Sequence, residues 1–325
     1  MPNISIITTT YQHADFIAQT IESVLGQTYS DWEMLIGDDS PDDATWDVIQ
    51  WYIAKYPDKI RARHHNPNKG IVDNMNFLIQ QCDSQSEYIS FLEGDDMYTA
   101  DNLMEKIKIF EKYPEVQLVY SDLSFIDKDN TIFLKSYFNH KEPIKSLQLL
   151  WVDDFLIKKK WFNIMSRSSS TIRKDILKTV RWIVKVSNEK NRSVSDFDFY
   201  IQIFSKYPIY YIDKALLLFR RHEWNLSANG SRIINDLNIL IEYYHDHQII
   251  NDITYRGIKS LYETISAVEY IYQWNKKIWR EVFFTWLKFN IFSFFIVKCK
   301  ILLLLLLPLW VSKKIIKSYR SQYNA

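Results

Sequence analysis

YISFLEGDD, residues 88–96, is the most informative segment of the chain. Its first five residues are β-prone and mostly apolar, and they are too few for a helix, so they predict a buried strand. The strand runs into the acidic loop Glu93-Gly94-Asp95-Asp96. Three carboxylates this close repel one another unless a cation lies among them. Oxygen ligands suit Mg²⁺ or Mn²⁺, and Gly94 allows the backbone to approach a ligand closely. A solvated acidic turn is the alternative interpretation.

The composition excludes several classes of protein. The chain has 325 residues, enough for one large domain or two, and a formal net charge of +1, so no basic field predicts nucleic-acid binding. Its two cysteines, Cys82 and Cys299, cannot build a disulfide framework or a cysteine metal site, which favours a reducing compartment. No signal-peptide pattern accompanies the first apolar run, residues 4–7, so we expect a cytoplasmic protein. The sequence has neither a Walker A loop nor a dinucleotide-binding glycine motif.

Around residues 88–96, strand-like runs alternate with amphipathic helices, which predicts a parallel sheet with crossover helices. The expected strands are residues 3–9, 32–36, 60–65, 88–92 and 116–121, and the expected helices are residues 14–25, 45–56, 71–82 and 99–113. Ligands of such sheets bind beyond the carboxyl ends of the strands. Tyr11, Asp38, Asp39 and Asp95 all follow predicted strand ends. We therefore expect them to converge at one edge of the sheet, which favours a ligand site over a solvated turn.

Five motifs, in their order and spacing, resemble those of the family 2 glycosyltransferases. They are ISIITTTY at residues 4–11, IESVLGQT at 21–28, GDDS at 37–40, NKG at 68–70 and FLEGDD at 91–96. Two later stretches, SDFDFY at residues 195–200 and RRHEWNLS at 220–227, resemble the family's acidic motif and its Arg-x-His-x-x-Asn-x-Ser stretch. The resemblance implies the GT-A fold, an α/β, Rossmann-like mixed sheet with helices on both faces. It implies a catalytic domain at residues 1–226, with a nucleotide-sugar half at 1–121 and an acceptor half at 122–226.

The resemblance also implies roles for individual residues. Thr9 and Tyr11 are expected to hold or stack on the nucleotide base, and Asp38 or Asp39 to accept from its ring N–H. The other expected contacts to the nucleotide are Asn68, Gly70, Asn76, Glu93 and Asp95. The expected ligands of a Mn²⁺ or Mg²⁺ ion are Asp95, Asp96 and His222. Contacts to the diphosphate or the acceptor are expected from Arg220, Asp198 and Ser170.

Asp196 falls at the position of the family's catalytic base, which implies an inverting transfer. A metal neutralises the diphosphate leaving group, while a carboxylate takes the proton of the attacking acceptor hydroxyl. By resemblance, the donor is a UDP-sugar, and the enzyme is a hexosyl- or N-acetylhexosaminyl-transferase. Its expected acceptor is lipid-linked or a polysaccharide, in cell-surface glycan synthesis.

Two rival functions stay open at this point. Met75, Glu93 and Ser195 depart from the family's usual residues, so an inactive nucleotide-binding scaffold is one alternative. A metal-dependent nucleotidyltransferase or phosphotransferase that uses the same acidic loop is the other.

The last hundred residues, 227–325, have a helical pattern throughout. From Lys276 onward, ten basic residues are opposed by a single acid, Glu281, among many aromatic and apolar side chains. The longest uncharged run near the end, residues 301–312, is interrupted by Pro308 and is shorter than the roughly 20 residues that a membrane span needs. We therefore expect residues 276–325 to dock peripherally on the inner face of the cell membrane. An internal packing helix or a homodimer interface is the alternative.

Overall fold

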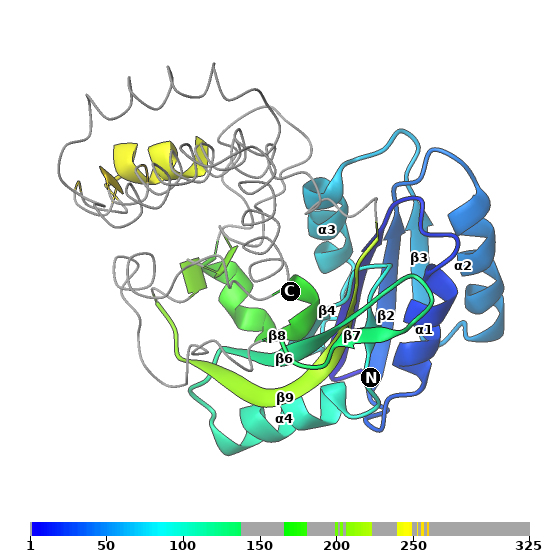
Figure 1. Cartoon of the computed structure of the whole chain (residues 1–325), viewed down its shortest axis with the longest axis horizontal. Coiled ribbons are helices and arrows are strands. Elements are labelled where there is room, and N and C mark those ends of the chain that lie inside the picture. Colours follow the sequence, from blue (N-terminus) through cyan, green and yellow to red (C-terminus); the bar gives the residue numbers. More distant parts are fainter. Residues whose placement is uncertain are drawn as a thin grey trace, which may run out of the picture. The chain divides into compact units, whose positions relative to one another are not determined.

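The computed structural model describes residues 2–137, 166–180, 206–222 and 239–248 of the chain. Shorter described pieces are residues 199–200, 202–203, 252, 255–256 and 259. The chain divides into two compact units, Met1–Phe155 with Lys159–Asn225, and Leu156–Lys158 with Leu226–Ala325. The first unit contains the described sheet, and in the second residues 239–246 are helical (Figure 1).

Four parallel strands form the first half of the sheet. They are β1 (Ile4–Thr10), β2 (Trp32–Asp38), β3 (Ile60–His64) and β4 (Tyr88–Phe91), in the spatial order β3-β2-β1-β4. Every residue of β1 and of β2 is buried. Strands buried on both faces are continuous β-branched or apolar runs rather than alternating ones, and the sequence of β1, ISIITTT, has this composition.

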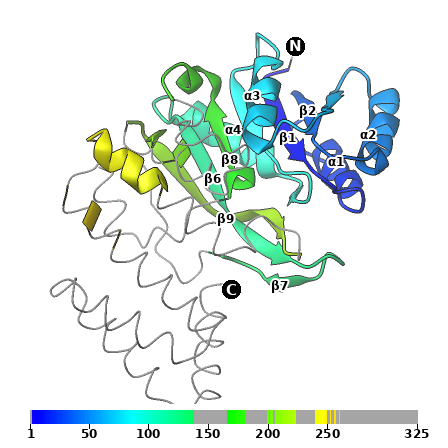
Figure 2. The same ribbon diagram turned by 90° about the horizontal axis from the view of Figure 1, so that it is seen from above.

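Three helices connect these strands, namely α1 (Ile17–Leu25), α2 (Ala44–Lys55) and α3 (Ile71–Gln80). Helices α1 and α2 contact each other on one face of the sheet, and α3 packs on the opposite face against β1 and β2 (Figures 1 and 2). Ile17, Ile21 and Val24 are buried at helical spacing along α1, as the sequence predicts. The helix begins three residues later than expected, because the carbonyl of His13 accepts the N–H groups of Phe16 and Ile17 in a preceding turn.

The second half of the sheet makes it mixed rather than purely parallel. Its elements are β5 (Met97–Tyr98), α4 (Asn102–Lys112), β6 (Leu118–Ile126), β7 (Ile132–Leu134), β8 (Ser170–Arg173) and β9 (Ile209–Arg220), with short 3₁₀ helices η2 (Arg167–Ser169) and η3 (Lys174–Lys178). The full order of the described sheet is β3-β2-β1-β4-β8-β6-β9-β5, with β7 paired to β6. Strand β8 runs antiparallel between β4 and β6, while β6 and β9 are parallel. The α/β mixed sheet expected from the sequence is therefore confirmed.

Strand β6 is longer than the sequence predicts. It ends at Ile126 rather than near residue 121, because its pairing with β9 continues as far as Arg220. This pairing carries residues 220–222 back to the acidic loop, since β9 also pairs with β5, the two-residue strand directly after that loop. The sheet thus brings a late part of the chain to a site built from the first hundred residues.

No helix among the described residues is long and apolar enough to cross a membrane. The proposed docking segment, residues 276–325, lies outside the described part of the chain.

Candidate active site at the carboxyl ends of the strands

The acidic loop is held close to the end of β1 by its glycine. The N–H of Gly94 donates to the Thr9 carbonyl at 2.9 Å, and the Thr20 hydroxyl donates to the carbonyls of Gly94 and Asp96 at 3.0 and 2.8 Å. A Cβ atom at position 94 would lie 2.5 Å from Oγ1 of Thr10. Gly94 is therefore required by the close packing of its backbone against the Thr10 side chain.

Glu93 is paired with an arginine that the sequence did not point to. Nε and Nη2 of Arg167 donate to Oε1 of Glu93 at 3.0 and 2.6 Å, and the Thr9 hydroxyl donates to Oε2. The side chain of Arg167 is only 5% exposed. Because both oxygens of Glu93 have protein donors, the charge of Glu93 is compensated within the protein by Arg167. Thr9 and Glu93 thus bond to each other, and their expected contacts to the nucleotide stay predictions.

Asp96 links the acidic loop to the end of β9. Its Oδ1 accepts the backbone N–H of Arg220 at 3.0 Å. Burial, together with the charge of Asp95, raises the pKa of Asp96 well above its usual value. Its expected role as a metal ligand stays a prediction, since it is not part of the cluster described next.

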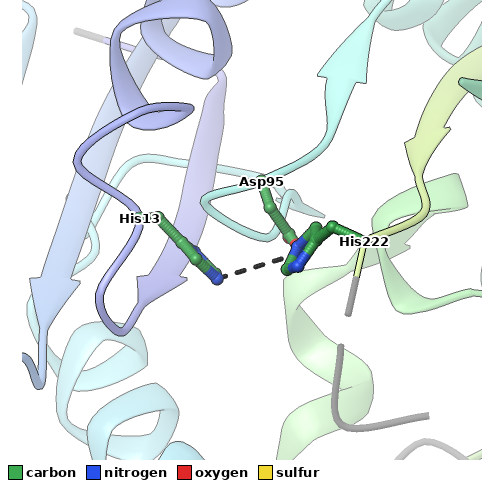
Figure 3. Close-up of side chains that lie close together, drawn as sticks. All are labelled: His13, Asp95 and His222. Atoms are coloured by element: carbon green, nitrogen blue, oxygen red, sulfur yellow. Dashed lines mark hydrogen bonds and ion pairs between the residues drawn. The ribbon is translucent and has the colours of Figure 1, made fainter. Parts of the chain in front are cut away.

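Asp95 lies between two imidazoles (Figure 3). Its Oδ2 is 2.9 Å from Nε2 of His222 and 3.9 Å from Nε2 of His13, and one donor atom from each of the three residues lies within 4.8 Å of the others. Although burial opposes ionisation, the neighbouring His13 and His222 lower the pKa of Asp95. An ionised carboxylate and two imidazole nitrogens converging in this way can hold a divalent metal ion. The expected pair Asp95 and His222 is thus brought together, with His13 in place of Asp96.

Arg220 holds the backbone of Asp95, the carboxylate residue of this cluster. The side chain is fully buried, and its Nε donates to the Asp95 carbonyl at 2.9 Å. Its other nitrogens donate to Oε1 of Gln19 at 2.8 Å and to the carbonyls of Asp127 and Lys128 at 3.0 and 3.3 Å. These bonds fix the backbone of Asp95. The diphosphate contact expected of Arg220 stays a prediction, and the geometry assigns it a supporting role.

Tyr11 lies at the rim of the site, directly after β1. Its side chain is 47% exposed, so it is not a core aromatic residue and its ring is free to stack on a base. The acids after β2 lie next to it in the sheet, because Thr10 and Asp38 are register partners in the β1–β2 pair, and Asp39 donates its N–H to the Thr10 carbonyl at 3.0 Å. The expected convergence of Tyr11 and Asp39 at one sheet edge is therefore present.

Asp38 and Asp39 differ in their surroundings. Asp38 is fully buried, and its Oδ1 accepts from the N–H and hydroxyl of Ser40. Asp39 is tied to the 68–70 turn, because Asn68 Nδ2 donates to its carbonyl at 2.9 Å and the Lys69 N–H donates to its Oδ1 at 3.2 Å. Burial raises the pKa of both carboxyls. Asp39 is also buried, at 3% exposure, and the expected contact of either acid to the base stays a prediction.

Of the other residues expected at the site, some lie within the described part of the chain and some lie outside it. Gly70 has φ of 81° and donates its N–H to Oδ1 of Asn68, so it shapes the turn before α3. Asn76 is half-buried on α3. Ser170 is fully buried, and its hydroxyl bonds the Arg167 carbonyl and the Tyr200 hydroxyl. The expected base Asp196 and its neighbour Asp198 lie outside the described residues.

A cavity of about 960 Å³ borders this site. Its lining includes Arg63, His65, Asn68 and Lys69, so it shares the turn that contacts Asp39, but neither the rim tyrosine nor the metal cluster lines it.

The mixed sheet, with acids and a His–Asp–His cluster at the carboxyl ends of its strands, defines the class to which this chain belongs, the GT-A glycosyltransferase fold. A family model described as "Glycosyl transferase family 2" matches residues 5–181, and the chain belongs to this family.

Three comparisons illustrate the relationship. The chain is 34% identical over 107 residues to TuaG of Bacillus subtilis, a putative teichuronic acid biosynthesis glycosyltransferase, covering 33% of this chain and 41% of that protein. It is 35% identical over 133 residues to WfaP of Escherichia coli, a UDP-Glc:α-D-GlcNAc-diphosphoundecaprenol β-1,3-glucosyltransferase, covering 41% and 50%. The mannosyltransferase PcManGT of Pyrobaculum calidifontis, solved with GDP-Man and Mn²⁺, superposes with a TM-score of 0.56 at 11% identity, covering 99% and 88%. The chain thus spans half or less of the length of these two curated relatives, and the structural likeness bears on the fold alone.

Proposed function

We propose that this protein is an inverting glycosyltransferase that moves a sugar from a nucleotide-sugar, with UDP as the nucleotide, to a lipid-linked or polysaccharide acceptor. One observation carries the proposal. Tyr11, Asp39 and the Asp95 cluster follow three different strands and meet at one edge of one sheet. A ring, a base-reading acid and a metal site are what a nucleoside diphosphate requires.

The donor's nucleotide is assigned to the rim of the sheet. The exposed ring of Tyr11 stacks on the base, and the Asp39 carboxylate accepts from its ring N–H. The 68–70 turn fixes Asp39 in place through its two bonds to that residue. Relatives support UDP as the nucleotide, since the name of WfaP specifies a UDP-sugar donor.

The diphosphate is assigned to the cluster of His13, Asp95 and His222. A divalent ion bound there supplies neutralisation of the charge that develops on the leaving diphosphate. The chain's own residues orient that site: Arg220 holds the Asp95 backbone, and Arg167 holds Glu93 away from it. By resemblance, Asp196 takes the proton from the acceptor hydroxyl, and attack opposite the leaving group inverts the anomeric centre.

The relatives and the sequence support the proposed acceptor and the proposed cellular location. The WfaP name specifies a diphosphoundecaprenol-linked acceptor, and TuaG is described in teichuronic acid biosynthesis, which supports a role in bacterial surface-glycan synthesis. A lipid-linked acceptor lies at a membrane, and the basic, aromatic segment 276–325 is suited to docking there.

The test is release of UDP from a panel of UDP-sugars by the full chain with Mn²⁺, with an undecaprenyl-diphosphate glycan as acceptor. We expect acceptor-dependent UDP release, at least about a hundredfold slower in Asp196→Asn, because a general base contributes roughly 10²–10⁴-fold. Asp175→Asn is the matched control, since Asp175 is an exposed aspartate that pairs with Lys178 along its own short helix.

The outcomes separate the rival functions. Release of pyrophosphate or inorganic phosphate instead of UDP would indicate the nucleotidyltransferase or phosphotransferase. UDP binding without any turnover would indicate the scaffold. Full activity in Asp196→Asn would place the base elsewhere.

A further inference from the structure

His13 is held in position by contacts on both sides of its ring. Its Nδ1 lies 3.2 Å from Oγ1 of Thr10, which leaves Nε2 facing Asp95 at 3.9 Å. The backbone around it is also fixed, because its carbonyl accepts two N–H groups at the start of α1. A ligand histidine is oriented in this way when its second nitrogen has a partner in the protein.

Phe16 positions both imidazoles of the cluster. Its ring centroid lies 6.4 Å from that of His13 and 5.1 Å from that of His222, and the two imidazole rings are 6.0 Å apart in an edge-on arrangement. The guanidinium of Arg220 covers the Phe16 ring at 4.7 Å. The side chains of His13 and His222 are 18% and 6% exposed, so a residue of the β1–α1 loop and a residue after β9 are packed toward the same carboxylate.

We propose that His13 is the third protein ligand of this metal site, and that the resulting two-histidine, one-carboxylate set selects Co²⁺ or Zn²⁺ over Mg²⁺, with Mn²⁺ between them. The proposal rests on the proposed function only in placing the ion where the donor's diphosphate binds. It deepens that function by making His13 a direct ligand of the ion rather than a neighbour of the site, and by stating a preference among metals.

The distances permit such a site. Metal–nitrogen and metal–oxygen bonds of about 2.0–2.2 Å place adjacent donors roughly 3 Å apart. The 2.9 Å between Asp95 and His222 already fits, and the 3.9 Å between Asp95 and His13 requires a movement of about 1 Å at the imidazole. The three donor atoms lie within 4.8 Å of one another, so closing them on one ion moves the His13 ring by about 1–2 Å in total. Rotation of the His13 side chain about its fixed backbone supplies this movement.

The preference follows from the donor atoms. Mg²⁺ demands oxygen ligands and gives up its waters reluctantly. Imidazole nitrogens suit zinc and the later transition metals, and affinity rises from Mn²⁺ to Co²⁺ for a given set of donors. With only one carboxylate among its three ligands, the site should bind Mg²⁺ weakly.

The experiment titrates Co²⁺ into the full-length chain without nucleotide and follows the visible d–d absorption, with calorimetric titrations of Mn²⁺ and Mg²⁺ alongside. We expect Mg²⁺ to bind at least about a hundredfold more weakly than Co²⁺. His13→Gln should weaken Co²⁺ binding by at least about tenfold, and Thr10→Val, which removes the partner of Nδ1, by about 10- to 100-fold. His247→Gln is the control, because that exposed histidine lies on the second unit, stacked on Tyr243.

A second readout does not depend on any variant. Pulsed EPR of the Cu²⁺-loaded wild-type chain counts coordinated imidazoles, and we expect two. A count of one, equal affinities for Mg²⁺ and Co²⁺, or unchanged Co²⁺ binding in a folded His13→Gln protein would each overturn the proposal.

The two proposals fail separately. If two imidazoles coordinate the metal but no UDP is released, the proposed metal site is supported and the proposed sugar transfer is refuted. If UDP is released at the same rate with Mg²⁺ as with Co²⁺ or Mn²⁺, and His13→Gln does not change that rate, sugar transfer is supported and the proposed metal site is refuted.

Discussion

Replacing Arg220 with methionine tests how the loop that carries Asp95 is held. Methionine has nearly the length of the arginine stem but no donors. The substitution removes three well-formed bonds, to the Asp95 carbonyl, to Gln19 and to the Asp127 carbonyl, at 2.9, 2.8 and 3.0 Å, and a longer one to Lys128 at 3.3 Å. Of the acceptors, the carbonyl of Asp95 is left on a buried residue, whereas Gln19 and Asp127 are half-buried and Lys128 is exposed.

The expected loss in the free energy of unfolding is worked out from those hydrogen bonds. A hydrogen bond from a charged donor contributes roughly 1.5–3 kcal/mol, so three give about 4–9 kcal/mol as a ceiling. Some acceptors regain partners, and a single broken buried network costs about 3–5 kcal/mol in practice. We expect the free energy of unfolding to fall by about 3–5 kcal/mol.

Urea unfolding followed by circular dichroism measures the loss. Arg63→Met is the matched control, because Arg63 is exposed at the edge strand β3, and a surface substitution of this kind changes stability by about 0.5 kcal/mol or less. A loss below about 1 kcal/mol in Arg220→Met would refute the claim that Arg220 holds the loop.

Three further predictions concern single side chains. Lys106 is fully buried, its Nζ has no hydrogen-bond partner among the described residues, and burial lowers its pKa from 10.5 to about 7. Between these two values the unfolded chain keeps a proton that the folded chain loses, so the stability of the wild-type protein should rise as the pH increases from about 7 to 10.5. Lys106→Met should remove this rise and be more stable than the wild type by about 2–5 kcal/mol near pH 6. Parallel pH profiles of the two proteins in urea unfolding would contradict this prediction. A Cβ at Gly37 would lie 1.8 Å from Oδ1 of the buried Asn74, so Gly37→Ala should cost about 1–3 kcal/mol in thermal unfolding, and an unchanged melting temperature would contradict this overpacking. Tyr11→Ala should weaken UDP binding by about tenfold or more in calorimetry, since stacking on a base contributes roughly 1–3 kcal/mol, while Tyr11→Phe should not; equal affinities in all three proteins would show that the ring does not stack.

The sheet and its edge were predictable because local patterns decide them. Short runs that are rich in β-branched and apolar residues, such as residues 4–10, favour a buried strand. Strand–helix alternation then sets the parallel order, and the carboxyl ends carry the ligand-facing residues. The placement of Tyr11 and Asp39 at one edge follows from these rules alone.

The bonding within the acidic loop was not predictable from sequence. Sequence shows three neighbouring carboxylates, but it does not show that Arg167, some seventy residues later, neutralises Glu93, or that Asp96 bonds the backbone of β9. Those contacts depend on β8 entering the sheet between β4 and β6 and on β9 returning to β5.

His13 was missed for a related reason. It lies in a loop, far in sequence from His222, and no periodic spacing links the two. The only available signal was its place two residues after Tyr11, at the end of a strand that already pointed to the ligand. A histidine at such an edge deserved consideration together with the acidic loop.

The most direct test of the account is calorimetric titration of UDP into the full-length chain, with and without Mn²⁺, compared with the same titration of Asp95→Asn. If the rim tyrosine and the His–Asp–His cluster form one donor site, Mn²⁺ should strengthen UDP binding in the wild-type chain and have no effect in Asp95→Asn. UDP affinity that is the same with and without Mn²⁺, or Mn²⁺-dependent binding that survives in Asp95→Asn, would contradict the account.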